Sequence, residues 1–337
     1  MNLPLEKPFV ISRGSTEVTH NVLVRLRAGE DEGLGECAPS SFYGESQQSV
    51  LETLPRLAEL LPEEPGPLQT VLERLSEAAP AARSALCALD LALHDLWGKR
   101  LDAPLYELLR LDPERVPPTS YTLSIGEPER VAAEAEKSAH WPILKVKLGT
   151  KERLGRDCDI EIIERVREVY DGTIRVDANC AWETDEAVEK IYALSAYDIE
   201  FFEQPVPPQT PDGLRLVKKG CPDAIIIADE SCRTAADVGA LHGAVDGVNV
   251  KLVKCGGVSE ALKIIYAAKA LDMRTMLGCM VESSLLITAA VHVAPLVDYI
   301  DLDGALLLAN DPFVGATCEQ GRFRLPERPG LGVTPRG

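Results

Sequence analysis

Several residue patterns are missing from this sequence, and each absence argues against a class of protein. Nine cysteines occur but none forms a C-x-x-C pair, so neither a disulfide scaffold nor a zinc site is expected. Basic residues are not in excess, and the net charge of −18 argues against nucleic acid or a membrane surface as a partner. The most apolar late stretch, residues 285–297, is too short to span a bilayer. No secretory signal is visible, so we expect a cytoplasmic protein.

The first 115 residues differ in pattern from the rest of the chain. Residues 20–40 alternate like a strand, turn between Gly29 and Gly33, and resume as an antiparallel partner. Helical patterns follow at 46–61, 67–78 and 81–101, and the last is apolar on most of its circumference, as a helix buried between layers is. The Pro-rich stretch 111–120 is typical of a linker. We therefore expect an N-terminal α+β domain over residues 1–115.

From Thr119 onward, short β-rich runs alternate with helical patterns. The runs are SYTLSI, ILKVKLG, TIRVDAN, IEFFEQP, AIIIADE, GVNVKLV, RTMLGCM and YIDLDGA. This α/β alternation favours right-handed βα units closed into a TIM barrel over residues 116–305. A doubly wound open sheet is the alternative, although no G-x-G-x-x-G pattern follows the first strand. The Pro- and Gly-rich segment 306–337 is expected to return to the N-terminal domain.

Three successive strands each end in a carboxylate: Asp177, Glu203 and Asp229. In a barrel, the carboxyl ends of the strands form the active-site face. One such residue alone is typical of a strand that ends in solvent, but three neighbouring carboxylates would repel one another unless a cation lay between them. All-oxygen ligands suit Mg²⁺, with Mn²⁺ as an alternative, better than zinc. The sequence therefore predicts one metal ion at this face.

Lysines occupy two strands that lie opposite each other in an eight-stranded ring. Lys145 and Lys147 are two residues apart, so they share one face of the second strand, and Lys251 lies on the sixth. Because both faces of a barrel strand are covered, such a lysine pair is expected to point into the mouth. Lys254 repeats the lysine spacing beyond the sixth strand and is expected to be an outer cation.

This set of residues implies a reaction. A metal-bound carboxylate has acidified α-hydrogens, because the cation stabilises the charge that forms on its oxygens. One lysine can remove the proton from one face of the carbon, and the other can return a proton to the opposite face. Racemisation or epimerisation is the simplest outcome.

The residues named above resemble those of the enolase superfamily, within its muconate-lactonising subgroup, over nearly the whole chain. The matching motifs are KVK, the Asp of VDAN, the Glu of EQP, the Asp of ADES and the Lys of KLVKCGG. The resemblance implies a modified (β/α)7β barrel with an N-terminal α+β capping domain, a bound Mg²⁺, and Lys147 and Lys251 as the two bases; a Lys base with Mg²⁺ is a mechanism known for this superfamily. None of the five histidines falls at a strand end, which argues against the mandelate racemase branch.

A narrower resemblance is to dipeptide epimerases of the L-Ala-D/L-Glu type. It rests on DLDG at 301–304, where Asp301 and Asp303 would hold the ammonium group of a dipeptide. Arg13 in ISRGS, Thr122 in YTLS and Lys145 are similarly implied to bind substrate. The activity expected is inversion of the α-carbon of the C-terminal residue of a dipeptide.

Several other functions are compatible with these residues. Within the superfamily they are N-acyl amino acid racemase, o-succinylbenzoate synthase and muconate cycloisomerase. Outside it, Lys251 could form a Schiff base as in metal-independent aldolases, or the barrel could be a non-catalytic binding protein. The sequence does not choose among dipeptides, and it is compatible with a homo-oligomer.

Overall fold

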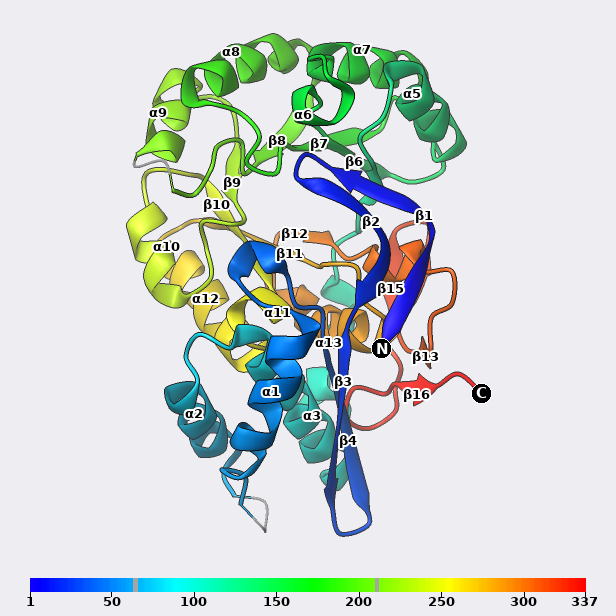
Figure 1. Cartoon of the computed structure of the whole chain (residues 1–337), viewed down its shortest axis with the longest axis vertical. Helices are drawn as coiled ribbons and strands as arrows, with labels where there is room; N and C mark the ends of the chain where they lie inside the picture. The colour runs from blue at the N-terminus through cyan, green and yellow to red at the C-terminus, as the bar shows by residue number, and fades with distance from the viewer. Residues whose placement is uncertain (63–65, 210–211) are drawn as a thin grey trace.

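The centre of the molecule is a barrel of eight parallel strands (Figure 1). The computed structural model describes residues 1–62, 66–209 and 212–337. The strands are hydrogen-bonded in chain order, and a parallel bridge between Thr119 and Ile300 joins the two ends of the sheet. The predicted barrel is therefore confirmed, and the open doubly wound sheet is wrong. The strands are β5 (Tyr121–Leu123), β6 (Ile143–Lys147), β7 (Thr173–Asp177), β8 (Ile199–Glu203), β9 (Ile226–Ala228), β10 (Gly247–Lys251), β11 (Arg274–Gly278) and β12 (Tyr299–Asp301).

Helices cover the outside of the barrel and bury its apolar strand faces. Along β6, Leu144 and Val146 pack into the main core, while Lys145 and Lys147 alternate with them and point inward. The helices are α5 (Pro128–Lys137), α6 (Lys151–Leu154), α7 (Asp159–Val169), α8 (Thr184–Leu194), α9 (Gly213–Gly220), α10 (Ala235–Leu241), α11 (Leu252–Cys255), α12 (Val258–Ala270) and α13 (Ser284–Val293). Short 3-10 turns follow α8 at Ser195–Tyr197 and α13 at Ala294–Leu296.

The N-terminal part combines two hairpins with a helical layer. Its elements are β1 (Asn2–Ile11), β2 (Gly14–His20), β3 (Val22–Ala28), β4 (Asp31–Cys37), α1 (Gln47–Ala58), α2 (Leu68–Ala78), α3 (Arg83–Arg100) and α4 (Leu105–Leu108), with 3-10 turns at Ser41–Tyr43 and Pro113–Arg115. Helix α3 is buried on most sides, as expected. The turn between β3 and β4 occupies only Gly29 and Glu30, because β4 begins at Asp31 and includes Gly33. A glycine is needed at position 33, since a Cβ there would come within 2.0 Å of Ala92 O. The expectation of a turn reaching Gly33 was wrong.

The β1–β2 hairpin, which the sequence patterns did not predict, lies across the open end of the barrel (Figure 1). Its β1 strand is anchored there by hydrogen bonds from Ile125 N to Val10 O and from Val10 N to Ser124 Oγ. The residues at its tip therefore reach the carboxyl ends of the strands.

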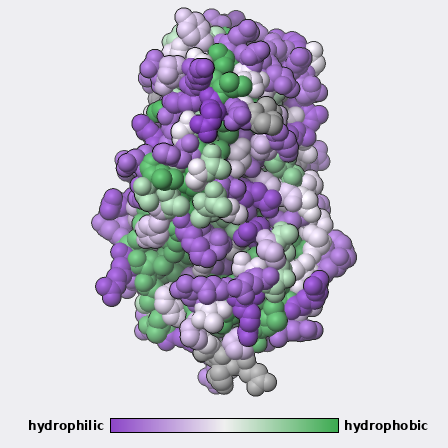
Figure 2. Space-filling model, turned by 90° about the vertical axis from the view of Figure 1, so that its left-hand side faces the viewer, coloured by the Kyte–Doolittle hydropathy of each residue, from purple (hydrophilic) through white to green (hydrophobic). Residues whose placement is uncertain are grey.

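The C-terminal segment runs back along α3 and α4. Leu105 N donates to Gly330 O, and Leu331 N donates to the Asp95 carboxylate at 2.8 Å. The segment contains a 3-10 turn (Gly304–Leu307) and the short strands β13 (Phe313–Val314), β14 (Thr317–Glu319), β15 (Arg322–Arg324) and β16 (Thr334–Pro335). Polar side chains cover most of the face in Figure 2, with apolar ones more frequent in its lower half. Within the described part of the chain, every helix is too short or too polar to cross a bilayer.

His292 links α13 to this segment and should make stability depend on pH. Its Nδ1 accepts a hydrogen bond from Tyr106 N and its Nε2 lies 3.1 Å from Leu331 O, an arrangement that requires the neutral ring. Burial lowers the pKa of His292 to about 4 from 6.5. The unfolded chain therefore binds a proton first as pH falls, and stability is lost between about pH 6.5 and pH 4.

Between pH 7 and pH 5, the wild type should lose about 2 kcal/mol more of its free energy of unfolding than a His292→Gln variant does. Urea unfolding of both proteins at the two pH values measures this difference. Equal losses in the two proteins would show that His292 does not titrate on unfolding in this range.

Candidate active site

The register of the strands brings charged residues to one level at the carboxyl end of the barrel. Lys147 pairs in register with Asp177, which pairs with Glu203 on the next strand. Asp229 follows β9 directly. The three carboxylates are fully buried. The structure therefore brings together the three residues that the sequence singled out as metal ligands.

Two of the predicted lysines reach these carboxylates from opposite sides of the ring. Lys147 Nζ on β6 lies 2.6 Å from Asp177 Oδ2, and Lys251 Nζ on β10 lies 2.8 Å from Asp229 Oδ2. Since β6 and β10 are four strands apart in a ring of eight, the two ammonium groups face the space between them from opposite walls. This is the placement expected from the sequence.

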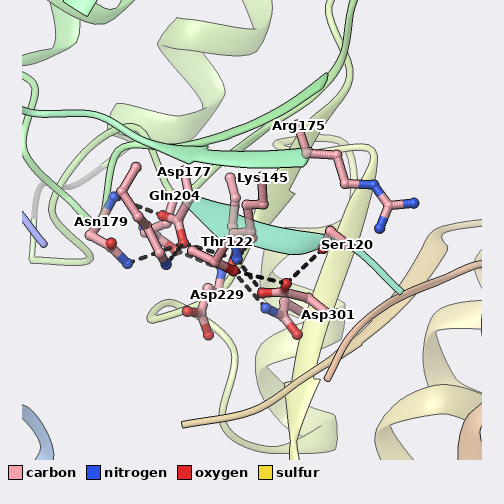
Figure 3. Close-up of polar contacts among 12 residues, drawn as sticks. Ser120, Thr122, Lys145, Arg175, Asp177, Asn179, Gln204, Asp229 and Asp301 are labelled. Atoms are coloured by element: carbon pink, nitrogen blue, oxygen red, sulfur yellow. Dashed lines mark hydrogen bonds and ion pairs between the residues drawn. The ribbon is translucent and has the colours of Figure 1, made fainter. Parts of the chain in front are cut away.

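Lys145 lies deeper than its neighbour and contacts three carboxylates (Figure 3). Its Nζ is 2.7 Å from Asp301 Oδ2, 2.7 Å from Glu203 Oε2 and 3.1 Å from Asp177 Oδ2. Burial lowers the pKa of Lys145, but the Asp301, Glu203 and Asp177 carboxylates outweigh burial and raise it well above its usual value. Lys145 is therefore a fixed positive charge at the centre of the site.

Glu203 is the carboxylate of the three whose ionised form its surroundings favour least. Burial and the nearby Asp177 raise the pKa of Glu203 to about 7. By contrast, Lys147 and Lys145 together outweigh burial and lower the pKa of Asp177. The surroundings of Glu203 therefore disfavour another anion. An added cation would relieve that repulsion.

The donor set suits a hard divalent ion. Asp177, Glu203 and Asp229 supply carboxylate oxygens only, and the buried Glu203 Oε2 has the Lys145 ammonium group as its contact, at 2.7 Å. Within residues 1–62, 66–209 and 212–337, no three His, Cys, Asp or Glu side chains already close around one point. The oxygens are instead turned toward lysine ammonium groups, so metal binding requires those lysine contacts to be exchanged.

Lys254 is not the outer cation that the sequence suggested. It is 1% exposed, and its Nζ lies 2.7 Å from Asp229 Oδ1 and donates to Asn249 O. Asn249 itself donates from Nδ2 to Glu203 Oε1 at 2.8 Å. The sequence patterns did not single out Asn249, although it lies two residues before Lys251 and so shares its face of β10.

Asp301 and Asp303 lie on the last strand and just beyond it, next to Lys145. Asp301 Oδ1 accepts hydrogen bonds from Ser120 Oγ at 2.6 Å and from Thr122 Oγ1 at 3.4 Å. Thr122 N donates to Asp303 Oδ2 at 2.7 Å. Burial and the Asp301 carboxylate raise the pKa of Asp303 to about 7. Thr122 thus lies beside the two aspartates.

Arg13 comes from the tip of the β1–β2 hairpin and closes one side of the site. Its Nη1 donates to Glu230 Oε1 at 2.7 Å and to Asn179 O at 2.8 Å, and its guanidinium lies 4.4 Å from the centre of the Phe42 ring. Glu230 is buried, and its Oε2 has no hydrogen bond among the described residues. The sequence patterns did not single out Glu230, the residue after Asp229 in ADES.

These groups border one cavity between the N-terminal part and the barrel. It has a volume of about 440 Å³, and its walls include Arg13, Thr122, Lys147, Lys251, Asp301 and Asp303. A larger hollow of about 630 Å³ lies between α2, α3 and α12, but none of these residues borders it. The 440 Å³ cavity is therefore the candidate active site.

The sequence models of two families match this chain. The mandelate racemase/muconate lactonizing enzyme N-terminal domain matches residues 1–110, and the enolase C-terminal domain-like family matches residues 129–337. The chain is 39% identical to an L-Ala-D/L-Glu epimerase of Bacteroides thetaiotaomicron, over 98% of this chain and 85% of that protein. It is 37% identical to an L-Lys-D/L-Arg epimerase of Methylococcus capsulatus, over 98% of this chain and 96% of that protein.

Solved structures agree with these sequence matches. A dipeptide epimerase from Cytophaga hutchinsonii, complexed with Mg and D-Ala-L-Val, has a TM-score of 0.92 and 32% identity, covering 100% of this chain and 94% of that one. One from Enterococcus faecalis, complexed with Mg and L-Leu-L-Tyr, has a TM-score of 0.92 and 33% identity, covering 99% and 97%. The family resemblance read from the motifs is confirmed: this chain belongs to the enolase superfamily, in the group of mandelate racemases and muconate-lactonising enzymes that includes the dipeptide epimerases.

Proposed function

We propose that this protein is a Mg²⁺-dependent dipeptide epimerase that inverts the α-carbon of the C-terminal residue by a two-base 1,1-proton transfer. The observation that carries the proposal is the pair Lys147 and Lys251, which border one cavity from opposite strands. Relatives of similar length that are named dipeptide epimerases support it.

Asp177, Glu203 and Asp229 would hold one Mg²⁺, with Mn²⁺ as a substitute. When bound, the cation would polarise the substrate carboxylate and so acidify the adjacent C–H bond. Lys145, which stays charged, would bind an oxygen of the same carboxylate. This placement would leave the α-carbon between the two lysines of the opposite walls.

Each lysine must be neutral when it removes a proton. In the structure, Asp229 and Glu203 outweigh burial and raise the pKa of Lys251 well above its usual value. A divalent cation bound to these carboxylates would offset their negative charge, lower the pKa of the lysine and so favour the neutral amine. Lys147 and Lys251 would then take turns: one accepts the α-proton from its side, and the other donates a proton to the opposite side.

Asp301 and Asp303 would recognise the N-terminal ammonium group of the dipeptide. Asp301 is already bonded to Lys145 and Ser120, whereas Asp303 accepts one hydrogen bond, from Thr122 N, among the described residues. An added positive charge would favour the ionised form of Asp303, whose pKa is raised in the structure. Arg13, together with Thr122, would border the peptide and its side chains.

The change Asp303→Asn should lower kcat/KM for a free dipeptide by about a hundredfold, because a partly desolvated ion contact is lost. Acetylation of the substrate amine should cause a similar loss in the wild type. The two losses should not add, because both delete the same contact. Steady-state kinetics on the four combinations measure this. Equal turnover of free and N-acetyl dipeptides would instead support an N-acyl amino acid racemase.

The direct test is a dipeptide library in ²H₂O with Mg²⁺, read by mass spectrometry for uptake of solvent deuterium. Dipeptides that gain one deuterium identify the substrates, and no uptake across the library contradicts the proposal. Borohydride trapping with the same library tests for a Schiff base on Lys251, and we expect none.

We also propose a division of the chain into three segments. Residues 1–115 would form the capping domain, residues 116–305 the barrel, and residues 306–337 a segment that returns to the cap. All nine cysteines are free thiols, which supports a cytoplasmic location.

A further inference from the structure

Asn179 lies beside Asp177 and uses two donors to hold its carboxylate (Figure 3). The backbone N of Asn179 donates to Asp177 Oδ1 at 2.8 Å, and its Nδ2 lies 3.2 Å from Asp177 Oδ2. Both residues are buried. Because both oxygens of Asp177 accept hydrogen bonds from Asn179, the orientation of the carboxylate depends on the conformation of Asn179.

That conformation is one that most residues avoid. Asn179 has a φ of 45° and the following Cys180 a φ of 67°, both in the left-handed region. Asn is among the few non-glycine residues that adopt this region readily. Hydrogen bonds from Ala178 N to Glu203 O and from Cys180 N to Gln204 O tie the turn to the next strand.

The carbonyl of Asn179 is held from the other side by the hairpin tip. Ser12 Oγ donates to Asn179 O at 3.0 Å, and Arg13 Nη1 donates to the same oxygen at 2.8 Å. Gly149 permits this approach, since a Cβ there would lie 2.3 Å from Ala181 Cβ and 3.0 Å from Ser12 Cβ. The hairpin tip thus contacts the carbonyl of the residue that orients Asp177.

We infer that Asn179 is a positioning residue that couples closure of the β1–β2 hairpin over the cavity to Mg²⁺ binding by Asp177. The inference rests on the proposed function, in which Asp177 is a metal ligand. With the hairpin closed, Ser12 and Arg13 hold the Asn179 carbonyl and so restrict the backbone of the residue whose N–H and side chain face Asp177. With it open, these two hydrogen bonds are lost and the left-handed turn is less constrained. The coupling is reciprocal, so Mg²⁺ must also favour the closed hairpin.

The first test measures Mg²⁺ affinity of the whole protein by calorimetry without substrate. Ser12→Ala should raise the Kd about threefold to tenfold, the range that the loss of one hydrogen bond gives. Ser12→Thr, which keeps the hydroxyl, should restore affinity. Ser15→Ala removes an exposed hydroxyl of the same hairpin with no hydrogen bond among the described residues, and it should leave the Kd unchanged.

The second test follows amide hydrogen exchange of residues 9–20 with and without Mg²⁺. The ion should slow exchange of the hairpin in the wild type but not in Asn179→Gly, which keeps the left-handed backbone and removes the side-chain donor. The coupling alone would be overturned if Ser12→Ala bound Mg²⁺ with the Kd of the wild type. It would also be overturned if Mg²⁺ did not change the amide exchange of the wild-type hairpin. Absence of Mg²⁺ binding by the wild type would overturn the proposed function with it.

Discussion

Replacing Lys147 or Lys251 by alanine is expected to abolish epimerisation, with a loss of at least about a thousandfold in kcat for each variant. Each lysine is the only proposed base on its side of the cavity, and removing a general base costs roughly a hundredfold to ten-thousandfold. Inversion needs both sides, so neither variant can complete it.

The two variants should nevertheless differ from each other. A protein with only Lys251 can still remove the α-proton from the epimer that faces it and return solvent deuterium to the same side. It should therefore exchange the α-proton of one epimer without inverting it, and the protein with only Lys147 should exchange that of the other. Proton NMR in ²H₂O with each pure epimer measures both processes.

Lys269→Ala is a suitable control, because this lysine is exposed at the end of α12 and has no ion pair among the described residues. It should behave as the wild type. Interconversion of epimers at the wild-type rate in either active-site variant would show that the two-base assignment is wrong.

Replacing Glu203 by glutamine is expected to lower turnover by about a thousandfold while leaving the fold intact. Glu203 is the middle ligand of the proposed set and pairs in register with Asp177. Glutamine keeps the shape and the hydrogen bonding of the strand but removes the charge that binds a hard cation. Removal of the metal by a chelator should have a similar effect on the wild type, and added Mg²⁺ should reverse it.

The readouts for Glu203→Gln are activity, Mg²⁺ binding by calorimetry, and circular dichroism as a check of folding. Glu189→Gln, a change of the same kind on the exposed face of α8, serves as the control. Full activity of a metal-free sample would contradict the proposed role of Asp177, Glu203 and Asp229.

The barrel and its strand-end charges could be predicted because they depend on short-range patterns. Alternation along β6 puts Lys145 and Lys147 inside, and parallel pairing puts Lys147, Asp177 and Glu203 in register. These are consequences of strand geometry, so the sequence alone contains them.

Other features depend on contacts between distant segments. Strand β1 has two prolines, half of its residues are exposed, and it is held by its contacts with the barrel. Lys254 reaches Asp229 because the short helix α11 turns back after β10. The Arg13–Glu230 pair joins residues far apart in the chain. Sequence spacing contains no signal for such contacts.

The central claim is that two lysines on opposite walls invert the α-carbon of a dipeptide. The most direct measurement takes the dipeptide of the library that turns over fastest, as one pure epimer, in ²H₂O with Mg²⁺, and follows configuration and deuterium content together at early times. The two-base account predicts that every molecule of the new epimer carries one deuterium at the α-carbon from the first turnover. A new epimer that retains the original proton, or no new epimer at all, would contradict it.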